Sequence, residues 1–423
     1  MITNRVKHAL AGITNMPLFE ILLLLSIFFI PVKMTVTLPY VENKVTLSEF
    51  FFVFATISFF VSVIKRKQSM RFSWKILPLV LMFLSTLVLF AYNLITKNDF
   101  YYFDLAISAY FLVFVFILYN FLRDSPKAYG KFVSAIFYSG VFVSVFSLAG
   151  IVLYILKFDF NAISELGFLF SESNRLVSTL ANPNYASLLF GALGIFFLAT
   201  YFKEKKKQYL YLSLFMIFSN FFTFSRAGLV SSFIVLAGFF IYTYAWKKFD
   251  RKTLLKIACI ILILSLVAVA ITFPKVKSRV RSAVGVSAET RNEIVGCVGT
   301  DYFHIFGLST LQIKEIIKEE TGKYVQFHNL FLTSIFRMGI LGIVFLLSFF
   351  GCIAHSFQEA RKSRKMGNAS FALLLVITFI ILWGMFHDLN DNKILWLFYS
   401  AVIALPYLKN GKNKSPPHNH PLH

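Results

Sequence analysis

The stretch from Asn220 to Phe233, NFFTFSRAGLVSSF, carries a single charge, that of Arg226, and lies between two long apolar runs. A guanidinium group is protonated at every physiological pH, and its planar fork of N–H donors matches the oxygens of a phosphate. Two interpretations follow. Arg226 extends to lipid phosphates at a membrane surface, or it holds the phosphate groups of a bound substrate.

His328 is the second residue whose position could support catalysis. It directly precedes the run NLFLTSIFRMGILG, which is predicted to be helical. The partial positive charge at a helix N-terminus disfavours imidazolium, so we expect His328 to be neutral and able to accept a proton. The alternative is an ordinary cap or interfacial residue. Arg337 lies about 180° further around the same helix and is not expected to face the same site.

A polar segment before another apolar run adds three candidate substrate-binding residues. Residues 157–184 end in Asn182, Pro183 and Asn184, a pattern that predicts a turn leading into a helix. The two asparagines either cap that helix or bind substrate. Arg175 in the same segment is a second candidate phosphate contact, with a solvated loop charge as the alternative.

The longest polar region is residues 274–328. Its charges are of both signs, and the stretch STLQIKEIIKEETGKY places isoleucines and a leucine among Lys and Glu, which predicts an amphipathic helix that must pack on something. A folded cap therefore fits better than a disordered loop. Arg291 in this region is a further candidate for a functional cation, whereas Arg279 and Arg281 could simply bind lipid headgroups.

Composition indicates the elements that must position these residues. Of the 423 residues, 57% are hydrophobic and 18% are aromatic, which is typical of a polytopic membrane protein rather than a soluble one. About twelve apolar runs are long enough to cross a membrane. We predict an all-α protein with spans at 17–36, 46–64, 76–96, 104–122, 132–156, 184–202, 208–224, 227–246, 254–273, 329–354, 370–386 and 394–408.

The predicted organisation follows from these spans. Residues 1–273 hold nine helices with short loops, residues 274–328 form a large, partly helical loop, residues 329–408 hold three more helices, and residues 409–423 form a tail. Lysine and arginine concentrate in alternate loops, and such loops resist translocation. Both termini are therefore expected in the cytoplasm, in a multi-pass protein of the inner (cytoplasmic) membrane. Arg226, the large loop and His328 then lie on the outer, periplasmic side.

The net charge of +22 is explained by these basic loops facing anionic lipid, so nucleic acid is not an expected partner, whereas membrane lipids are. The chain has no GxxxxGK[ST] motif, and its predicted outer loops have no Asp-Xaa-Asp. We expect no metal and no cofactor. The stretch HDLNDN offers His387, Asp388 and Asp391 either as a solvated turn with a helix cap or as metal ligands, and Asp388 is an alternative base.

Four motifs in order resemble the O-antigen ligase family, which also contains O-antigen and capsule polymerases. They are ANPNYAS at the start of one helix, SRAG at the outer end of another, TRNEIV in the large loop and HNLFLTSIFRMGILG after it. The similarity covers roughly residues 180–350 and the twelve-helix plan. After Arg291 the sequence departs from the Gly-rich stretch of many members, because HIFGLST keeps only Gly307.

The resemblance implies a glycosyltransferase of lipopolysaccharide biosynthesis. Such an enzyme takes a glycan from undecaprenyl diphosphate at the periplasmic face and transfers it to a sugar hydroxyl. The resemblance implies that Arg226 and Arg291 act as cations on the departing diphosphate and that His328 acts as the base. A single displacement of this kind inverts the anomeric configuration.

The acceptor distinguishes the possible activities within the family. A ligase uses lipid A-core, and the order arginine, arginine, histidine resembles the ligases best. A polymerase uses the same donor with a second lipid-linked repeat as acceptor. A transporter for lipid-linked glycans is a third possibility, although transporters carry ionisable residues deep in their spans, and here the charges lie mostly at helix ends.

Overall fold

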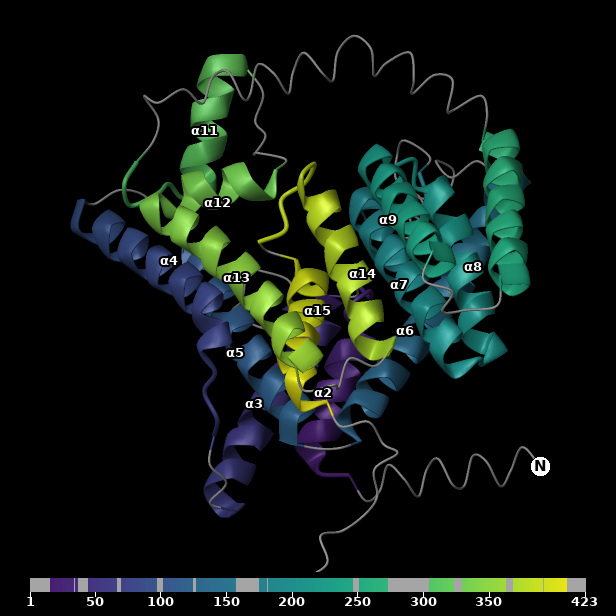
Figure 1. Cartoon of the computed structure of the whole chain (residues 1–423). Helices are drawn as coiled ribbons and strands as arrows, with labels where there is room; N and C mark the ends of the chain where they lie inside the picture. The colour runs from purple at the N-terminus through teal and green to yellow at the C-terminus, as the bar shows by residue number, and fades with distance from the viewer. Residues whose placement is uncertain are drawn as a thin grey trace, which may run out of the picture.

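A computed structural model of the chain describes residues 16–33, 35–36, 45–66, 70–96, 102–124, 127–156, 175–180, 182–245, 251–272, 304–322, 329–362, 368–390 and 392–408 (Figure 1). These residues are almost entirely helical, apart from one antiparallel pair of two-residue strands, β1 and β2. The chain is an all-α polytopic membrane protein. Its elements are α2 (Leu18–Phe28), β1 (Thr35–Val36), β2 (Val45–Thr46), α3 (Leu47–Arg66), η1 (Trp74–Ile76), α4 (Leu77–Thr96), α5 (Tyr102–Asp124), α6 (Ala128–Ile155), η4 (Ser178–Leu180), α7 (Pro183–Glu204), α8 (Lys207–Phe222), α9 (Arg226–Ala245), a helix over Arg251–Thr272, α11 (Thr310–Thr321), α12 (Leu330–Met338), α13 (Ile340–Lys362), α14 (Asn368–Gly384), α15 (Lys393–Ala404) and η6 (Leu405–Tyr407).

Eight of the described helices are long and apolar enough to cross a membrane. They include α3 to α7, α9, the helix over Arg251–Thr272 and α13. The four other predicted spans coincide with shorter helices, namely α2, α8, α14 and α15. Multi-pass membrane insertion therefore rests on eight described helices, and the number of twelve spans stays a prediction.

The predicted helix over 329–354 is interrupted, so a single straight span there was wrong. Gly339 has φ 56° and separates α12 from α13. A Cβ at Gly339 would lie 2.5 Å from the carbonyl carbon of Ile305, and one at Gly307 (φ 86°) would lie 2.6 Å from that of Arg337. Only glycine combines this backbone conformation with so close an approach. The two glycines thus let residues 304–309 pack against the break, beneath α11 (Figure 1).

Helix α7 forms the centre of the bundle and carries part of the site at its first turn. It packs against α8, α9 and α14, and 89% of its most apolar window is buried. Small residues permit this contact: a Cβ at Gly191 would overlap the ring of Phe379, and one at Gly194 would lie 2.9 Å from Cγ1 of Ile217. Close approach at glycines is typical of helices packed in membranes.

One end of the bundle carries the basic loops. Lys75 in η1, which is buried, pairs with Glu359 near the end of α13, and Lys131 in α6 pairs with Glu20 in α2. The last turn of α7 and the start of α8 lie beside the start of α6, and together they line a pocket at this end of the bundle. The candidate site lies at the other end of α7.

Candidate functional site

The turn between α8 and α9 places Arg226 at the first position of α9. Thr223 Oγ1 donates to the carbonyl of Asn220 at 2.7 Å and accepts from the backbone N–H of Ser225 at 3.2 Å. Phe224 adopts φ 50°, a conformation that costs energy in a residue with a side chain and that often marks functional turns. The turn is therefore held rigidly, and Arg226 starts a helix at a fixed place.

Gly228 allows α9 to contact α7 directly. A Cβ at this position would lie 2.8 Å from the Cβ of Ser187 and closer still to its hydroxyl. Ser187 Oγ donates to Asn220 Oδ1 at 2.6 Å, and the Asn220 amide donates to Ser232 Oγ at 3.1 Å. All three polar side chains are buried. The glycine of the SRAG motif thus has a packing role, because it joins α7, α8 and α9 beneath the turn.

Arg175 connects the preceding segment to both neighbouring helices. Its Nε donates to the carbonyl of Thr223 at 2.7 Å, and its Nη2 donates to Asn184 Oδ1 at 2.9 Å. The backbone N–H of Leu176 also donates to the carbonyl of Phe222 at 2.9 Å. Arg175 therefore is not simply a solvated loop charge; it fixes the α8–α9 turn against the first turn of α7.

The two asparagines of ANPN have different environments. Asn182 is the N-cap of α7, and its Oδ1 accepts from the backbone N–H groups of Asn184 (2.8 Å) and Tyr185 (3.4 Å). Pro183 follows at the first helical position, where a missing N–H costs nothing. Capping thus accounts for the contacts of Asn182, whereas Asn184 turns its amide oxygen toward Arg175.

These elements surround a pocket of about 310 Å³. Arg226 is exposed there, and His387 is buried with its ring stacked on that of Trp383 at a centroid distance of 4.2 Å. The residues that line the pocket are Arg175, Asn184, Phe224, Ser225, Arg226, Ala227, Val230, Phe386 and His387.

The pocket has the electrostatic properties of an anion site. Its described lining contains two arginines and no carboxylate. The N-terminus of α9 adds the partial positive charge of the helix dipole, which favours a phosphate. Phosphate oxygens can accept from several guanidinium donors at once. A phosphorylated ligand is therefore the class that best matches these residues.

A second polar cluster lies around Arg337 and has a structural explanation. Arg337 is buried and pairs with Asp104 of α5 at 3.0 Å, while Asp104 also accepts from the backbone N–H of Thr310 at 3.0 Å. Asp388 Oδ2 lies 4.0 Å from Arg337 Nη1, and its Oδ1 accepts from the backbone N–H of Asn390. This cluster ties α5, α11, α12 and the α14–α15 connection together.

The large loop contributes α11, whose apolar side is covered. Ser309 and Gln312 form a capping box at its start, and Gly322 ends it with φ 70°. Ile313 and Ile317 are buried against Phe336 of α12. The amphipathic pattern of this stretch therefore folds onto the bundle rather than onto a partner.

Several predicted site residues lie outside the described residues, namely Arg291, His328 and Asp391. The neighbour of His328, Asn329, is described. It is the N-cap of α12, and its amide donates to the carbonyl of Met385 at 2.9 Å. Met385 directly precedes Phe386 and His387, so the start of α12 is fixed beside the segment that lines the pocket.

His387 is the pocket residue for which the sequence offered only a solvated turn or a metal ligand. Its signal was weak, because one histidine after an apolar run is common, and what reveals it is the stacking on Trp383. Among the described residues, no group of three or more His, Cys, Asp and Glu side chains is placed to hold a metal ion.

No protein-family model and no curated protein sequence matches the chain.

Proposed function

We propose that the chain is a membrane glycosyltransferase that transfers a glycan from a polyprenyl diphosphate to a sugar hydroxyl of lipid A-core. The expected polyprenyl carrier is undecaprenyl diphosphate. The observation that supports this proposal is the convergence of Arg175 and Arg226 with Asn184 on one pocket, at the end of the bundle opposite the basic loops. A diphosphate carries the charge that two guanidinium groups can neutralise.

The reaction assigns a role to each residue. The acceptor oxygen attacks the anomeric carbon, the bond from that carbon to the diphosphate oxygen breaks, and the bonding electrons leave with the diphosphate. Arg226 and Arg291 stabilise the negative charge that develops on it. Arg175 lines the same pocket and adds its charge there, and it also positions the α8–α9 turn through Thr223 and Asn184. The product has the inverted configuration.

The acceptor proton requires a base. His328 is proposed for this role because its neighbour Asn329 is fixed beside the segment that ends in His387. A neutral imidazole accepts a proton at neutral pH. His387 itself lines the pocket, so a substitution of His387 is the comparison for a substitution of His328.

The orientation completes the proposal. With the basic loops in the cytoplasm, the pocket opens at the periplasmic face of the inner membrane, where a lipid-linked glycan can enter from the outer leaflet. The energy comes from the sugar-diphosphate bond of the donor, with no nucleotide.

The test is a transfer assay with the purified full chain, an undecaprenyl-diphosphate-linked glycan and EDTA, with lipid A-core and a second lipid-linked repeat offered separately. Product on lipid A-core supports the ligase. Longer chains on the polyprenyl lipid would instead identify a polymerase, and no product with either acceptor would contradict both. EDTA tests directly whether the reaction requires a divalent metal.

The same assay tests the arginine. Arg226→Ala is expected to lower transfer by about 10² to 10³, the cost of removing one group that stabilises developing charge. Arg226→Lys should also be poor because an ammonium group lacks the planar fork. Arg71→Ala, an exposed arginine at the basic end, is the matched control and should keep full activity. Equal activity of the Arg226 and Arg71 variants would refute the role of Arg226.

A further inference from the structure

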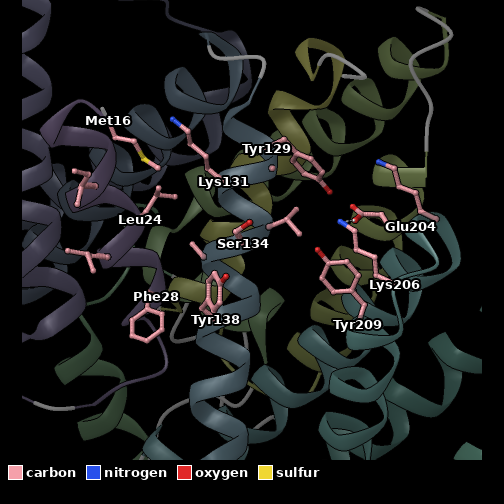
Figure 2. Close-up of a pocket in the computed structure, with 16 residues that line it drawn as sticks. Met16, Leu24, Phe28, Tyr129, Lys131, Ser134, Tyr138, Glu204, Lys206 and Tyr209 are labelled. Atoms are coloured by element: carbon pink, nitrogen blue, oxygen red, sulfur yellow. Dashed lines mark ion pairs between the residues drawn. The ribbon is translucent and has the colours of Figure 1, made fainter. Parts of the chain in front are cut away.

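A second pocket lies at the basic end of the bundle, between α2, α6 and the α7–α8 connection (Figure 2). Its volume is about 660 Å³. It is separate from the candidate active site, because Asn184 stands at the first turn of α7 whereas Lys203 and Glu204 stand at its last turn, about 30 Å away at 1.5 Å per residue.

The part of this pocket between α2 and α6 has a mostly apolar lining. Leu24 and Phe28 of α2 lie on one side, and Val133 and Tyr138 of α6 lie on the other. Figure 2 shows the labelled side chains of α6 following one another from Lys131 through Ser134 to Tyr138. Along α6 this distance is about 10 Å, enough for the first part of an acyl chain to lie parallel to the helices.

The mouth of the pocket is cationic and hydroxyl-rich. Lys131, Lys203 and Lys206 line it together with a single carboxylate, that of Glu204, and with tyrosine hydroxyls. Lys131 is already engaged, because it pairs with Glu20 of α2 and so joins the two walls. Lys203 is exposed, and Lys206 pairs with Glu204 at 2.7 Å while 58% of its side chain stays exposed.

Lys206 keeps its positive charge in the pair with Glu204. The hydrogen bond from Lys206 to Glu204 and the charge of that carboxylate raise the pKa of the lysine, so it is protonated at neutral pH. An exposed ion pair is weak and exchanges readily with another anion. A phosphate at the mouth can therefore be bound by Lys203 and Lys206 together.

We propose that this pocket binds one anionic phospholipid from the leaflet that faces the basic loops, which the positive-inside rule assigns to the cytoplasm. The phosphate contacts Lys203 and Lys206, the tyrosine and serine hydroxyls contact the glycerol region, and one acyl chain lies between α2 and α6. A cationic mouth on an apolar cleft between helices is the arrangement that binds acidic headgroups. The bound lipid would join α2 to the α7–α8 connection and so support the central helix α7.

The test is native mass spectrometry of the purified, delipidated full chain titrated with dioleoylphosphatidylglycerol or dioleoylphosphatidylcholine. The chain is expected to bind one phosphatidylglycerol at least tenfold more tightly than phosphatidylcholine. Replacing two lysines near the phosphate, Lys203→Gln with Lys206→Gln, should weaken phosphatidylglycerol binding by about tenfold to thirtyfold. Equal binding of the two lipids would overturn the proposal.

The run KEKKK supplies its own control. Lys205→Gln with Lys207→Gln removes the same charge from the same connection, but neither lysine lines the pocket. This control should leave the affinity nearly unchanged. A loss as large as that of the Lys203 and Lys206 pair would show a diffuse surface effect and refute a defined site.

A second variant pair tests the apolar part without changing charge. Ser134→Trp fills the pocket from an exposed position of α6, whereas Val145→Trp places the same side chain at a position on that helix that is 62% exposed and outside the pocket. Only Ser134→Trp should abolish the single tight phosphatidylglycerol adduct. An adduct that persists in Ser134→Trp would contradict the acyl-chain placement.

Discussion

Substituting Gly228, which contacts Ser187, tests whether the packing of α9 on α7 positions Arg226 for catalysis. An alanine at position 228 would place its Cβ 2.8 Å from the Cβ of Ser187, whereas ordinary contacts begin at 3.4 Å. Rotation of the serine hydroxyl cannot relieve this clash, because it involves the Cβ atoms. The α7 and α9 backbones must therefore separate by at least about 0.6 Å.

The cost of Gly228→Ala has two parts. Overpacking in a tight contact costs about 1–3 kcal/mol, and loss of the buried hydrogen bond from Ser187 to Asn220 adds about 1 kcal/mol. We expect the free energy of unfolding to fall by about 2–4 kcal/mol. Because Arg226 begins the same helix, it moves with the contact, and a displacement approaching 1 Å can lower a rate about 10²-fold.

The assay compares Gly228→Ala with Gly238→Ala on the same helix, where nothing lies within 4 Å of the added methyl group. Thermal unfolding in detergent and the transfer rate are measured for both. Gly238→Ala should behave like the unmodified chain. If Gly228→Ala matches it in both stability and rate, the contact between α7 and α9 does not position Arg226. Adding Ser187→Ala to Gly228→Ala should restore part of the stability, since the hydroxyl is the nearest obstruction.

Three further substitutions test the surrounding structure. Gly339→Ala should destabilise the chain by about 1–3 kcal/mol in thermal unfolding, because φ is 56° and the carbonyl carbon of Ile305 is 2.5 Å from the added atom. Asp104→Ala should cost about 3–5 kcal/mol in the same measurement, since it leaves Arg337 buried without its 3.0 Å partner; an unchanged melting temperature would contradict this. Arg175→Lys should lower the transfer rate and cost about 1–2 kcal/mol, because one ammonium group cannot reach both acceptors of the original fork.

Helix positions were predictable to the extent that hydropathy alone determines them. A run of apolar residues in lipid must form a helix, since its backbone has no other hydrogen-bond partners. The break at Gly339 was not predictable in this way. Hydropathy continues unchanged across it, and what ends α12 is the backbone conformation of one glycine together with the approach of Ile305 from a distant segment.

Residues of the candidate site could be predicted from the sequence where the residue type has few common roles in proteins. Arg226 stood out because a lone arginine between apolar runs requires an anion or a headgroup. Asn182 illustrates the opposite case: asparagine both caps helices and binds ligands, and only its contacts with the N–H groups of Asn184 and Tyr185 distinguish the two. The place of His387 depends on the ring of Trp383, and no local pattern in the sequence encodes that contact.

Arg226 and Arg337 show why charge in an apolar helix has to be interpreted from its surroundings. Both are arginines near the same end of the bundle, and from the sequence Arg226 was a candidate phosphate contact whereas Arg337 was expected to face away from the site. Arg337 is buried against Asp104 and joins three helices, so its charge is neutralised within the protein. Arg226 is exposed and lines a pocket whose described lining contains two arginines and no carboxylate, which suits an anionic ligand. Disrupting the pair of Arg337 should therefore lower stability and activity together, whereas replacing Arg226 should lower activity alone. A loss of stability on replacing Arg226 would place it with the structural cluster and remove the basis for a diphosphate site.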